Sequence, residues 1–425
     1  MATTVIVMIG IVLSGFALPR LAVGQPCAYV ANLMSDSVSV IDTATNVVAA
    51  TIPVGHNPNG IAVSRYSGMV CVTNFLSNDV SLIDSRTQTV AATVAVGAGP
   101  VGVARPPGGD LPDPDIPESF VYVGNKKDHS VSVVEVGTAR VVATIQVDQN
   151  PDGVAVGASK VYVTHSVPAG SLSVIETATN SVVAKIPVGA RPSRVAFTPD
   201  GRFAYVTNFG SFNVSVIDTA TNAVTATIGL SLKPSDVAIT PDGQSAYVTN
   251  FGAPIVSIIP VMTNAVIAAI TVGAEPAAIA HIRNRGHAYT YVANSRSDSV
   301  SVIDRAHDNN VVATIPVGHM PFAVAVGPGN CAVLPPASPT TTQSATVVPS
   351  LTPVATHTVT PTASTTSTST ATCTPTSTRT STPTMTPNRN GGGGCAIDGA
   401  AGEHGSLPGL LLGVVLFWRR RRLSR

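Results

Sequence analysis

The feature that most constrains how this chain can fold is a short segment that returns seven times. Each copy is a run of apolar and β-branched residues, and six of the seven copies end in Asn. The second residues of successive copies are 42, 51, 40, 43, 42 and 44 positions apart: Tyr29, Cys71, Tyr122, Tyr162, Tyr205, Tyr247 and Tyr291. A repeat of about 40–45 residues is typical of one four-stranded blade of a β-propeller. The spacing therefore predicts seven blades.

The fifth repeat indicates how one blade is built. Its sequence predicts four strands, over residues 204–207, 213–217, 223–228 and 236–240. Asp218 and Asn222 lie in the hairpin between the second and third of these strands, where Asp and Asn are favoured because they hydrogen-bond their own backbone or tolerate positive φ. The chain is 44% hydrophobic but only 4% aromatic, and no long amphipathic helical stretch occurs. The predicted class is all-β.

These repeats resemble the YVTN family of β-propellers, which is found in microbial surface-layer and related exported proteins. The matching strings are YVTN at 205–208 and 247–250, SVSVIDTATN at 37–46 and VVATIPVG at 311–318. The resemblance covers about 300 residues and implies the propeller fold. It implies little about activity, because propellers carry many unrelated functions, and related members include lactonases and subunits of redox enzymes.

The resemblance also implies how the ring closes. In related propellers the Pro-containing strand of each repeat is the innermost one. Carried over to this chain, the first strand near Cys27 is the second strand of a blade, and residues 321–326 are an inner strand with no followers. The two pieces would complete one shared blade, so that no sheet in the ring keeps an incomplete edge. We expect a seven-bladed β-propeller over residues 25–333, closed by pairing of its N- and C-terminal strands.

Two cysteines flank the predicted ring. Cys27 lies just before the first strand and Cys331 just after the last, so ring closure would bring them together across one hairpin. A disulfide between them suits an exported protein, and the chain-entropy model gives it at most about 5 kcal/mol for a loop of roughly 300 residues. Two unpaired thiols are the alternative, which a Cα separation beyond about 7 Å would require. Cys71 replaces a strand Tyr and is expected to be a buried thiol.

Residues 1–24 are expected to be a signal peptide. Residues 5–18 form an apolar run, and Ala22, Val23 and Gly24 are the small residues before a cleavage point that follows Gly24. No Lys or Arg precedes the apolar run, and a buried N-terminal helix is the alternative interpretation. A signal peptide would make this an exported protein.

Residues 334–394 are rich in Thr, Ser and Pro and end in a Gly linker, 391–394. Such a tract cannot bury a core, so we expect an extended, disordered stalk that is open to O-glycosylation. At about 3.1 Å per residue, roughly 55 residues would span up to about 170 Å. The stalk would hold the propeller away from the cell envelope.

The last segment, 395–425, contains Cys395, an apolar run over 407–418 and four Arg at 419–422. It resembles bacterial C-terminal sorting signals of the MYXO-CTERM kind, and the resemblance implies processing or lipid attachment at Cys395. The apolar run is shorter than the about 20 residues that a stable membrane span needs, and the Arg cluster would keep that end in the cytoplasm. A plain membrane anchor is the alternative. Both interpretations tether the protein to the envelope, and the bacterial outer membrane is the expected place.

The charge of the predicted propeller argues against a nucleic-acid partner. Residues 25–333 contain 16 Lys and Arg against 21 Asp and Glu, whereas the whole chain has a net charge of +1. A nucleic-acid-binding domain needs a basic face to neutralise phosphates. The chain also lacks the sequence motifs for covalent haem attachment, for a His-Glu-x-x-His zinc site, for a nucleophile elbow and for a phosphate-binding loop. We therefore predict no cofactor.

Candidate functional residues are those that depart from the repeat. The Asn that ends each first segment recurs in six blades, so we expect it to make structural hydrogen bonds. Polar side chains that do not recur lie on the loops entering the inner strands: His56, Asp148, Gln149, Arg191, Arg194, Lys233, Glu275 and His319. By analogy with other propellers, these residues would converge around one mouth of the central channel. Two histidines on neighbouring blades fall short of the three or four ligands that zinc usually needs, so no metal site is predicted and ordinary solvated loop residues are the alternative.

These features favour a non-enzymatic, monomeric propeller that is displayed on the cell surface and binds a protein, glycan or surface-layer partner. The alternative is a propeller enzyme, a lactonase-like hydrolase or an oxidoreductase, with its site at the channel mouth. A cluster in which His56, His319 and acidic groups meet within about 5 Å would favour catalysis. Scattered, solvated side chains would favour binding.

Overall fold

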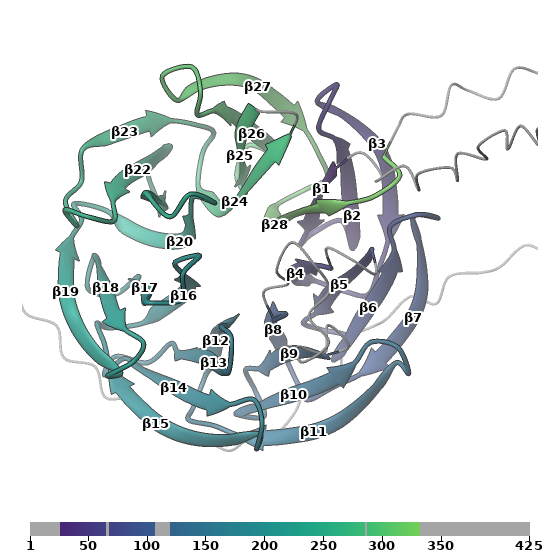
Figure 1. Ribbon diagram of the computed structural model, residues 1–425. Coiled ribbons are helices and arrows are strands. Elements are labelled where there is room, and N and C mark those ends of the chain that lie inside the picture. Colours follow the sequence, from purple (N-terminus) through teal and green to yellow (C-terminus); the bar gives the residue numbers. More distant parts are fainter. Residues whose placement is uncertain (1–25, 65–67, 107–119, 285–286, 332–425) are drawn as a thin grey trace, which may run out of the picture. The chain divides into compact units, whose positions relative to one another are not determined.

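The structure is a computed structural model that describes residues 26–64, 68–106, 120–284 and 287–331. Every regular element in these residues is a β-strand, and the strands form seven four-stranded antiparallel sheets around a ring (Figure 1). The predicted all-β, seven-bladed propeller is confirmed. The signal peptide, the stalk and the C-terminal segment with Cys395 lie outside the described residues. No helix capable of crossing a membrane is found within the described part of the chain.

Each blade contains one inner, one second, one third and one outer strand. The inner strands, which face the centre of the ring in Figure 1, are β4 (Pro58–Val63), β8 (Pro100–Ala104), β12 (Pro151–Val156), β16 (Pro192–Phe197), β20 (Lys233–Ile239), β24 (Pro276–Asn284) and β28 (Pro321–Pro328). The second strands are β1 (Pro26–Asn32), β5 (Met69–Asn74), β9 (Phe120–Asn125), β13 (Lys160–His165), β17 (Phe203–Asn208), β21 (Ser245–Phe251) and β25 (His287–Asn294).

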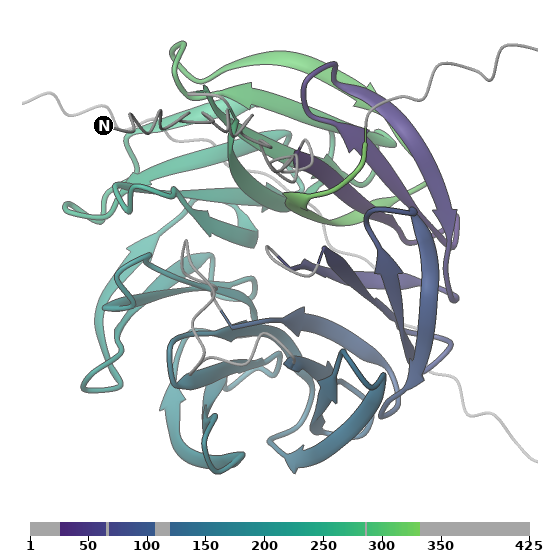
Figure 2. The ribbon, with the colours of Figure 1, turned by 45° about the vertical axis from the view of Figure 1, so that its right-hand side comes forward.

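The other two strands of each blade complete the sheet toward the rim. The third strands are β2 (Ser37–Asp42), β6 (Asp79–Asp84), β10 (Ser130–Glu135), β14 (Ser171–Glu176), β18 (Asn213–Asp218), β22 (Ile255–Pro260) and β26 (Ser299–Asp304). The outer strands, on the rim in Figures 1 and 2, are β3 (Val47–Pro53), β7 (Thr89–Ala95), β11 (Arg140–Gln146), β15 (Ser181–Pro187), β19 (Ala223–Gly229), β23 (Ala268–Thr271) and β27 (Asn310–Pro316). We number the blades 1 to 7 in the order of their second strands.

Blade 1 is shared between the two ends of the described chain. Its strand order is β28-β1-β2-β3, and β28 pairs antiparallel with β1 so that Ala325 lies opposite Tyr29. The other six blades are built from four strands that follow one another in sequence. Closure by the N- and C-terminal strands is therefore confirmed.

The predicted disulfide is also present. Cys27 and Cys331 are bridged, with Cα atoms 5.8 Å apart, and the bond joins residues separated by 304 positions. Both side chains are buried. Cys71 is a buried free thiol, as expected, and burial raises its pKa to about 12.

One inner strand begins earlier than the sequence pattern indicates, whereas β28 begins at residue 321 as predicted. In the fifth repeat we expect a strand from residue 236, but β20 already begins at Lys233. Pro234 pairs with Asn250, and the register shifts by a bulge before Val237. Pro is tolerated at the start of a strand or at a bulge because no ladder hydrogen bond from its nitrogen is needed there. A shift in pairing register also follows the Pro at the start of the other inner strands. In β16, for example, the shift lies between Pro192 and Val195.

The hydrophobic core consists of thin layers between neighbouring blades. One layer, for instance, combines Tyr205 and Val216 of blade 5 with Ala246 and Ile259 of blade 6. Val, Ile and Ala suit this arrangement because both faces of each sheet pack against another sheet. Each fully buried Val or Ile contributes roughly 1.5–3 kcal/mol relative to an exposed one.

The recurring Tyr and Asn of the repeat also join blades. A Tyr hydroxyl on a second strand donates a hydrogen bond to the amide oxygen of the Asn in the hairpin of the next blade, and the pairs are Tyr162–Asn222, Tyr205–Asn264, Tyr247–Asn309 and Tyr291–Asn46. We call this contact the Tyr–Asn clamp. The hairpin Asn residues have positive φ, as with Asn222 at 54°, which Asn tolerates better than most residues.

The Asn that ends each second strand has the structural role that the sequence predicts, although its bonds lie within the sheet and not in a turn. Asn294 Nδ2 donates to the hydroxyls of Ser299 and Ser301 on the adjacent strand, at 3.3 and 3.0 Å. The same contact to a third-strand Ser recurs in the other blades that carry this Asn, as at Asn208 with Ser215. These side chains are buried.

The ring has two distinct faces. The loop face carries the loops from each outer strand to the next inner strand and the turns between second and third strands. The hairpin face carries the turns between inner and second strands and the third-to-outer hairpins. Because β1 begins and β28 ends on the hairpin face, both Pro26 and Cys331 lie there. Asn330 N, next to Cys331, donates to Ser85 O in the hairpin of blade 2.

Candidate functional site

Six of the eight candidate residues lie in loops of the loop face, and Arg194 and Lys233 lie in the inner strands β16 and β20. A repeated cap holds several of these loops in place. In four blades the last residue of the second-to-third turn has a positive φ and its side chain accepts a hydrogen bond from a backbone N–H of the loop entering the next blade. The acceptor and donor residues are Asp36 and Asn57, Asn78 and Gly99, His129 and Asn150, and Asp298 and Met320. The cap fixes each entering loop against the preceding blade.

His56 is part of one such cap. Its Nδ1 lies 2.7 Å from Asp36 Oδ2, and 76% of its side chain is exposed. The backbone N–H of Asn57 donates to the other oxygen of the same carboxylate at 2.8 Å. The bond from Asn57, together with that from His56, holds the pKa of Asp36 below its ordinary value. His56 is thus an exposed ring bound to an ionised carboxylate.

His319 repeats this arrangement in the neighbouring blade. Its Nδ1 lies 2.8 Å from Asp298 Oδ2, and its backbone N–H donates to Ser35 Oγ. Each histidine is therefore paired with an aspartate from the preceding blade, and the structure does not place both rings on one acidic group. Among the described residues, no group of three or more His, Cys, Asp or Glu is arranged to hold a metal ion.

Asp148 and Gln149 contact blade 4, whose second strand carries His165 where the second strands of the other blades carry Asn. Asp148 forms an ion pair with Lys185, which lowers the pKa of Asp148. The carbonyl oxygen of Gln149 accepts from His165 Nδ1 at 3.3 Å, which puts the imidazole proton on Nδ1 and leaves Nε2 to accept from the Ser173 hydroxyl at 2.8 Å. Burial lowers the pKa of His165. His165 therefore performs in blade 4 the structural role of the missing Asn.

Three further candidates directly precede the Pro of an inner strand. Arg191 and Glu275 have left-handed backbones, with φ of 47° and 50°. Glu275 pairs with the exposed Arg296 at 3.1 Å. Lys233 Nζ lies 5.4 Å from the centre of the Phe209 ring, within the range of a cation–π contact. These side chains each have a separate, solvated environment.

Arg194 belongs to the most buried charged cluster on the inner strands. Its Nη1 lies 3.1 Å from Asp152 Oδ1, and Lys126 Nζ lies 3.3 Å from Asp152 Oδ2, with Arg194 and Asp152 only 20% and 17% exposed. The neighbouring Asp236 accepts from the backbone N–H of Ile279 at 3.0 Å, and burial raises its pKa while Arg194 opposes the rise. The four charged residues come from four consecutive blades. We call them the inner-strand charge cluster.

Of this cluster only Arg194 is among the eight candidate residues; Lys126 is noticeable in the sequence as a polar residue that does not recur in the repeat, and Asp152 and Asp236 were missed. A signal for Asp236 exists in the repeat, and it also marks Arg194. The second residue after the inner-strand Pro is Gly60, Gly102 and Gly153 in blades 2 to 4, but Arg194 and Asp236 in the next two. Blades 7 and 1 carry Ala278 and Ala323 there, so a charged side chain at a position otherwise occupied by Gly or Ala marks an inner strand with room for a larger side chain.

Apolar side chains on the loop face are also absent from the sequence-based candidates. Met34 and Leu76 occupy corresponding turn positions in blades 1 and 2, and each is 60% exposed. Phe212 is exposed on the turn of blade 5. Single exposed apolar residues are ordinary, but these lie on the same face as the exposed His–Asp pairs. The loop face therefore combines apolar and ionic groups.

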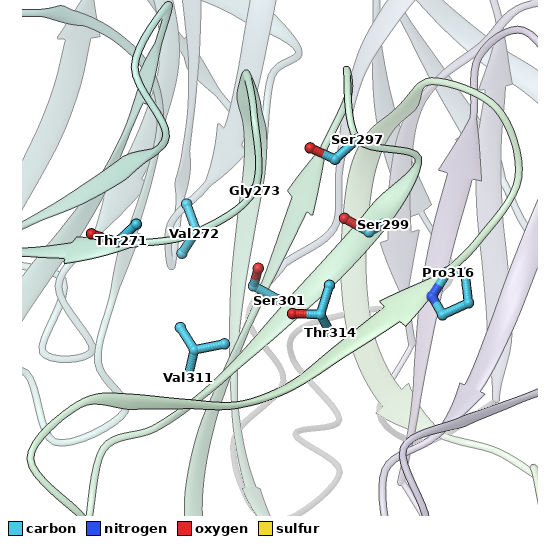
Figure 3. A pocket seen from close by; sticks show the side chains of 9 residues that line it. All are labelled: Thr271, Val272, Gly273, Ser297, Ser299, Ser301, Val311, Thr314 and Pro316. Atoms are coloured by element: carbon cyan, nitrogen blue, oxygen red, sulfur yellow. The ribbon is translucent and has the colours of Figure 1, made fainter.

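Two grooves lie between neighbouring blades. One of about 490 Å³ lies between the end of β23 and the strands β26 and β27, and Figure 3 shows Ser297, Ser299, Ser301 and Thr314 lining it opposite Thr271. A second groove of about 480 Å³ occupies the equivalent place between blades 2 and 3. Neither groove is lined by any of the eight candidate residues. Their recurrence indicates that they follow from the spacing of the blades.

Comparison with known proteins supports the fold. No protein-family model matches the chain, and no curated protein matches it in sequence. Among solved structures, a hydrazine synthase of Kuenenia stuttgartiensis is similar with a TM-score of 0.56 and 24% identity, over 63% of this chain and 88% of that chain. A protein of unknown function from Desulfotomaculum acetoxidans DSM 771 is similar with a TM-score of 0.61 and 16% identity, over 71% of this chain and 99% of that one. At these identities the likeness concerns the fold, and the chain shares the β-propeller architecture with both.

Proposed function

We propose that this chain is an exported propeller of the YVTN kind, tethered to the envelope through its C-terminal segment, that binds a protein, glycan or surface-layer partner through its loop face. The observation that carries this proposal is the position of the chain ends. Pro26 and Cys331 both lie on the hairpin face. A tether that begins after Cys331 starts on that face and leaves the opposite, loop face free for a partner.

The chemistry of the loop face supports binding over catalysis. His56 and His319 are exposed and bound to separate aspartates, as expected for solvated binding-surface groups. Met34 and Leu76 add apolar area next to these charged groups, and protein-binding surfaces commonly combine an apolar centre with a polar rim. Catalysis by acid–base chemistry needs two such groups within hydrogen-bond reach of one reacting atom. Each of the two histidines is instead bound to a carboxylate that caps an entering loop.

The binding proposal is tested with matched variants of the full-length protein. Met34→Ser combined with Leu76→Ser changes the loop face, whereas Met262→Ser changes a 96% exposed apolar residue on the hairpin face. A partner captured by cross-linking from intact cells should be lost with the loop-face variant and kept with Met262→Ser. Loss with Met262→Ser alone would contradict the proposal, and saturable binding of one metal ion per chain with hydrolytic turnover would favour the propeller enzyme instead.

The tether is tested separately. We propose that Cys395 is the site of processing or lipid attachment, on the strength of its place before an apolar run and an Arg cluster. Cys395→Ser should release the protein from the membrane fraction or leave its C-terminal segment uncleaved, as read by fractionation and intact mass. An unchanged fraction and mass would support a plain membrane anchor.

A further inference from the structure

Three of the seven boundaries between blades lack the Tyr–Asn clamp, and one of them lacks it although both residues are present. Blade 3 carries Tyr122 and blade 4 carries Asn180, at the same repeat positions as the clamped pairs. Here, however, the hydroxyl and the amide do not bond, and Asn180 Oδ1 is buried without a hydrogen-bond partner in the part of the chain that the structure describes. A buried acceptor without a partner costs roughly 1–3 kcal/mol. The hydrogen bond from Tyr122 that would complete the clamp at this boundary is not formed.

A cavity of about 350 Å³ occupies the place of the missing bond. Its wall includes Phe120, Tyr122 and Val133 of blade 3 and Val156 and Asn180 of blade 4. It lies on the hairpin face, away from the loop-face residues. Cavities that hold small ligands commonly have volumes of about 300–1,000 Å³ and mostly apolar walls with few polar groups.

The sequence explains why the cavity forms at this boundary. At the next boundary Phe197, the last residue of β16, packs on the Tyr162 ring with centroids 4.8 Å apart. The corresponding residue of β12 is Val156, which is much smaller. The turn after β12, over residues 157–159, is also shorter than the turn after β16, over 198–202. A small side chain and a short turn leave the space that Phe197 fills elsewhere.

The lining of the cavity defines what it can hold. None of the described residues that line it is charged, so an ion would lose its hydration without gaining a counter-charge from them. The apolar wall suits an aromatic or alicyclic body, and the unpartnered oxygen of Asn180 requires a donor. We propose that this cavity is a binding site for a small, uncharged, largely apolar molecule that donates one N–H or O–H bond to Asn180 Oδ1. The proposal does not rest on the loop-face function.

Indole and indene are suitable probes, because they have nearly the same shape but only indole carries an N–H. Saturation-transfer NMR on the full-length protein should show saturable binding of indole, roughly three- to tenfold tighter than that of indene, which is the range for one hydrogen bond. Asn180→Gly removes the acceptor and tolerates the positive φ of this position. It should abolish the preference for indole while indene still binds.

Two further variants test the position of the site. Val156→Phe introduces the side chain that already fits at the next boundary, and should weaken indole binding by at least about tenfold, because it fills the volume. Val142→Trp crowds the cavity from an exposed position on β11, and Val183→Trp is its control at the equivalent, equally exposed position of β15, outside the cavity. Only the first of these two should impair binding.

Several outcomes would overturn the proposal. They are absence of binding by either probe up to its solubility, undiminished binding to Val156→Phe or Val142→Trp, and equal affinities for indole and indene. Residues 107–119 connect Pro106 and Phe120, both at the cavity wall. Binding that appears only after deletion of 107–119 would mean that the chain's own segment is the occupant, and would also overturn it.

Discussion

At the scale of single residues, two recurring positions of the repeat, a Tyr and an Asn, are the partners of one hydrogen bond between blades. Tyr on a second strand and Asn in a hairpin belong to different blades, and the Tyr–Asn clamp joins them across four boundaries. At one boundary both halves change, since Cys71 replaces the Tyr of blade 2 and Ala139 stands where the hairpin of blade 3 would carry Asn; at another, blade 1 keeps Tyr29 while Gln88 replaces the hairpin Asn of blade 2. The sequence shows both motifs but not that they are partners, because the pairing depends on the blade-to-blade geometry.

The clamp predicts a difference between two equivalent substitutions. Tyr205→Phe removes a hydroxyl that donates to Asn264 Oδ1 at 2.7 Å, and should lower the free energy of unfolding by about 1 kcal/mol. Tyr122→Phe removes a hydroxyl that makes no clamp and should have an effect close to zero. Urea denaturation of both variants measures the difference, and equal losses would show that the clamp does not stabilise the ring.

His281 predicts how stability depends on pH. Its Nε2–H donates to Ala238 O and its Nδ1 accepts from the Thr290 hydroxyl, while burial lowers its pKa from 6.5 to about 3. Below pH 6.5 the unfolded chain binds a proton that the folded protein does not. The free energy of unfolding should therefore fall by about 1.4 kcal/mol per pH unit from this group as the pH drops from about 6.5 toward 3.

His281→Gln cannot be protonated at this position and should therefore lack this part of the loss of stability in acid. At pH 7.5 protonation of residue 281 should not affect the free energy of unfolding of either protein. His165, also buried with a lowered pKa, contributes in the same sense and remains in the variant. Parallel pH profiles of wild type and His281→Gln, measured by urea denaturation, would contradict the assignment.

At the scale of elements, the inner strands approach one another so closely that some positions admit only Gly. A Cβ at Gly60 would lie 2.2 Å from Val101 O of the next inner strand. The contact is with backbone, which cannot move aside as a flexible side chain could. In blades 5 and 6 the same position carries Arg194 and Asp236, and the inner-strand charge cluster forms there.

Substitution of these glycines tests the close approach. Gly60→Ala should lower the free energy of unfolding by about 1–3 kcal/mol, the usual range for overpacking. Gly229→Ala, at the end of β19 with open space around the added Cβ, should change it by less than about 0.5 kcal/mol. Comparable losses for the two variants in urea denaturation would argue that the inner strands can separate without cost.

The element scale also shows where the sequence was sufficient and where it was not. The spacing of the repeats predicted seven blades and their four-strand composition, because each blade is one local supersecondary unit. It missed that β20 begins at Lys233, since a Pro normally argues against a strand and the bulge that accommodates it has no sequence pattern of its own. The predicted convergence of loop residues rested on analogy, and the structure gives His56, Asp148 and Glu275 separate partners.

At the scale of the whole molecule, the disulfide and the shared blade hold the two ends of the ring together. Replacement of Cys27 and Cys331 by Ser should lower the free energy of unfolding by about 2–5 kcal/mol, because the open chain gains entropy when it unfolds. Reduced wild type should behave like the double variant. A double variant as stable as the oxidised protein would show that the strand pairing of blade 1 alone is sufficient.

The central claim is that β28 and β1 form one sheet that closes seven blades into a ring, and native-state hydrogen exchange of the full-length protein tests it most directly. Paired strands exchange slowly, because their amides open only in larger unfolding events. We expect the amides of β28 and β1 to be protected as strongly as those of β16 and β17, which form the equivalent pair within blade 5. Exchange of the β28 amides at the rate of an unpaired chain, with β1 still protected, would contradict the closed ring.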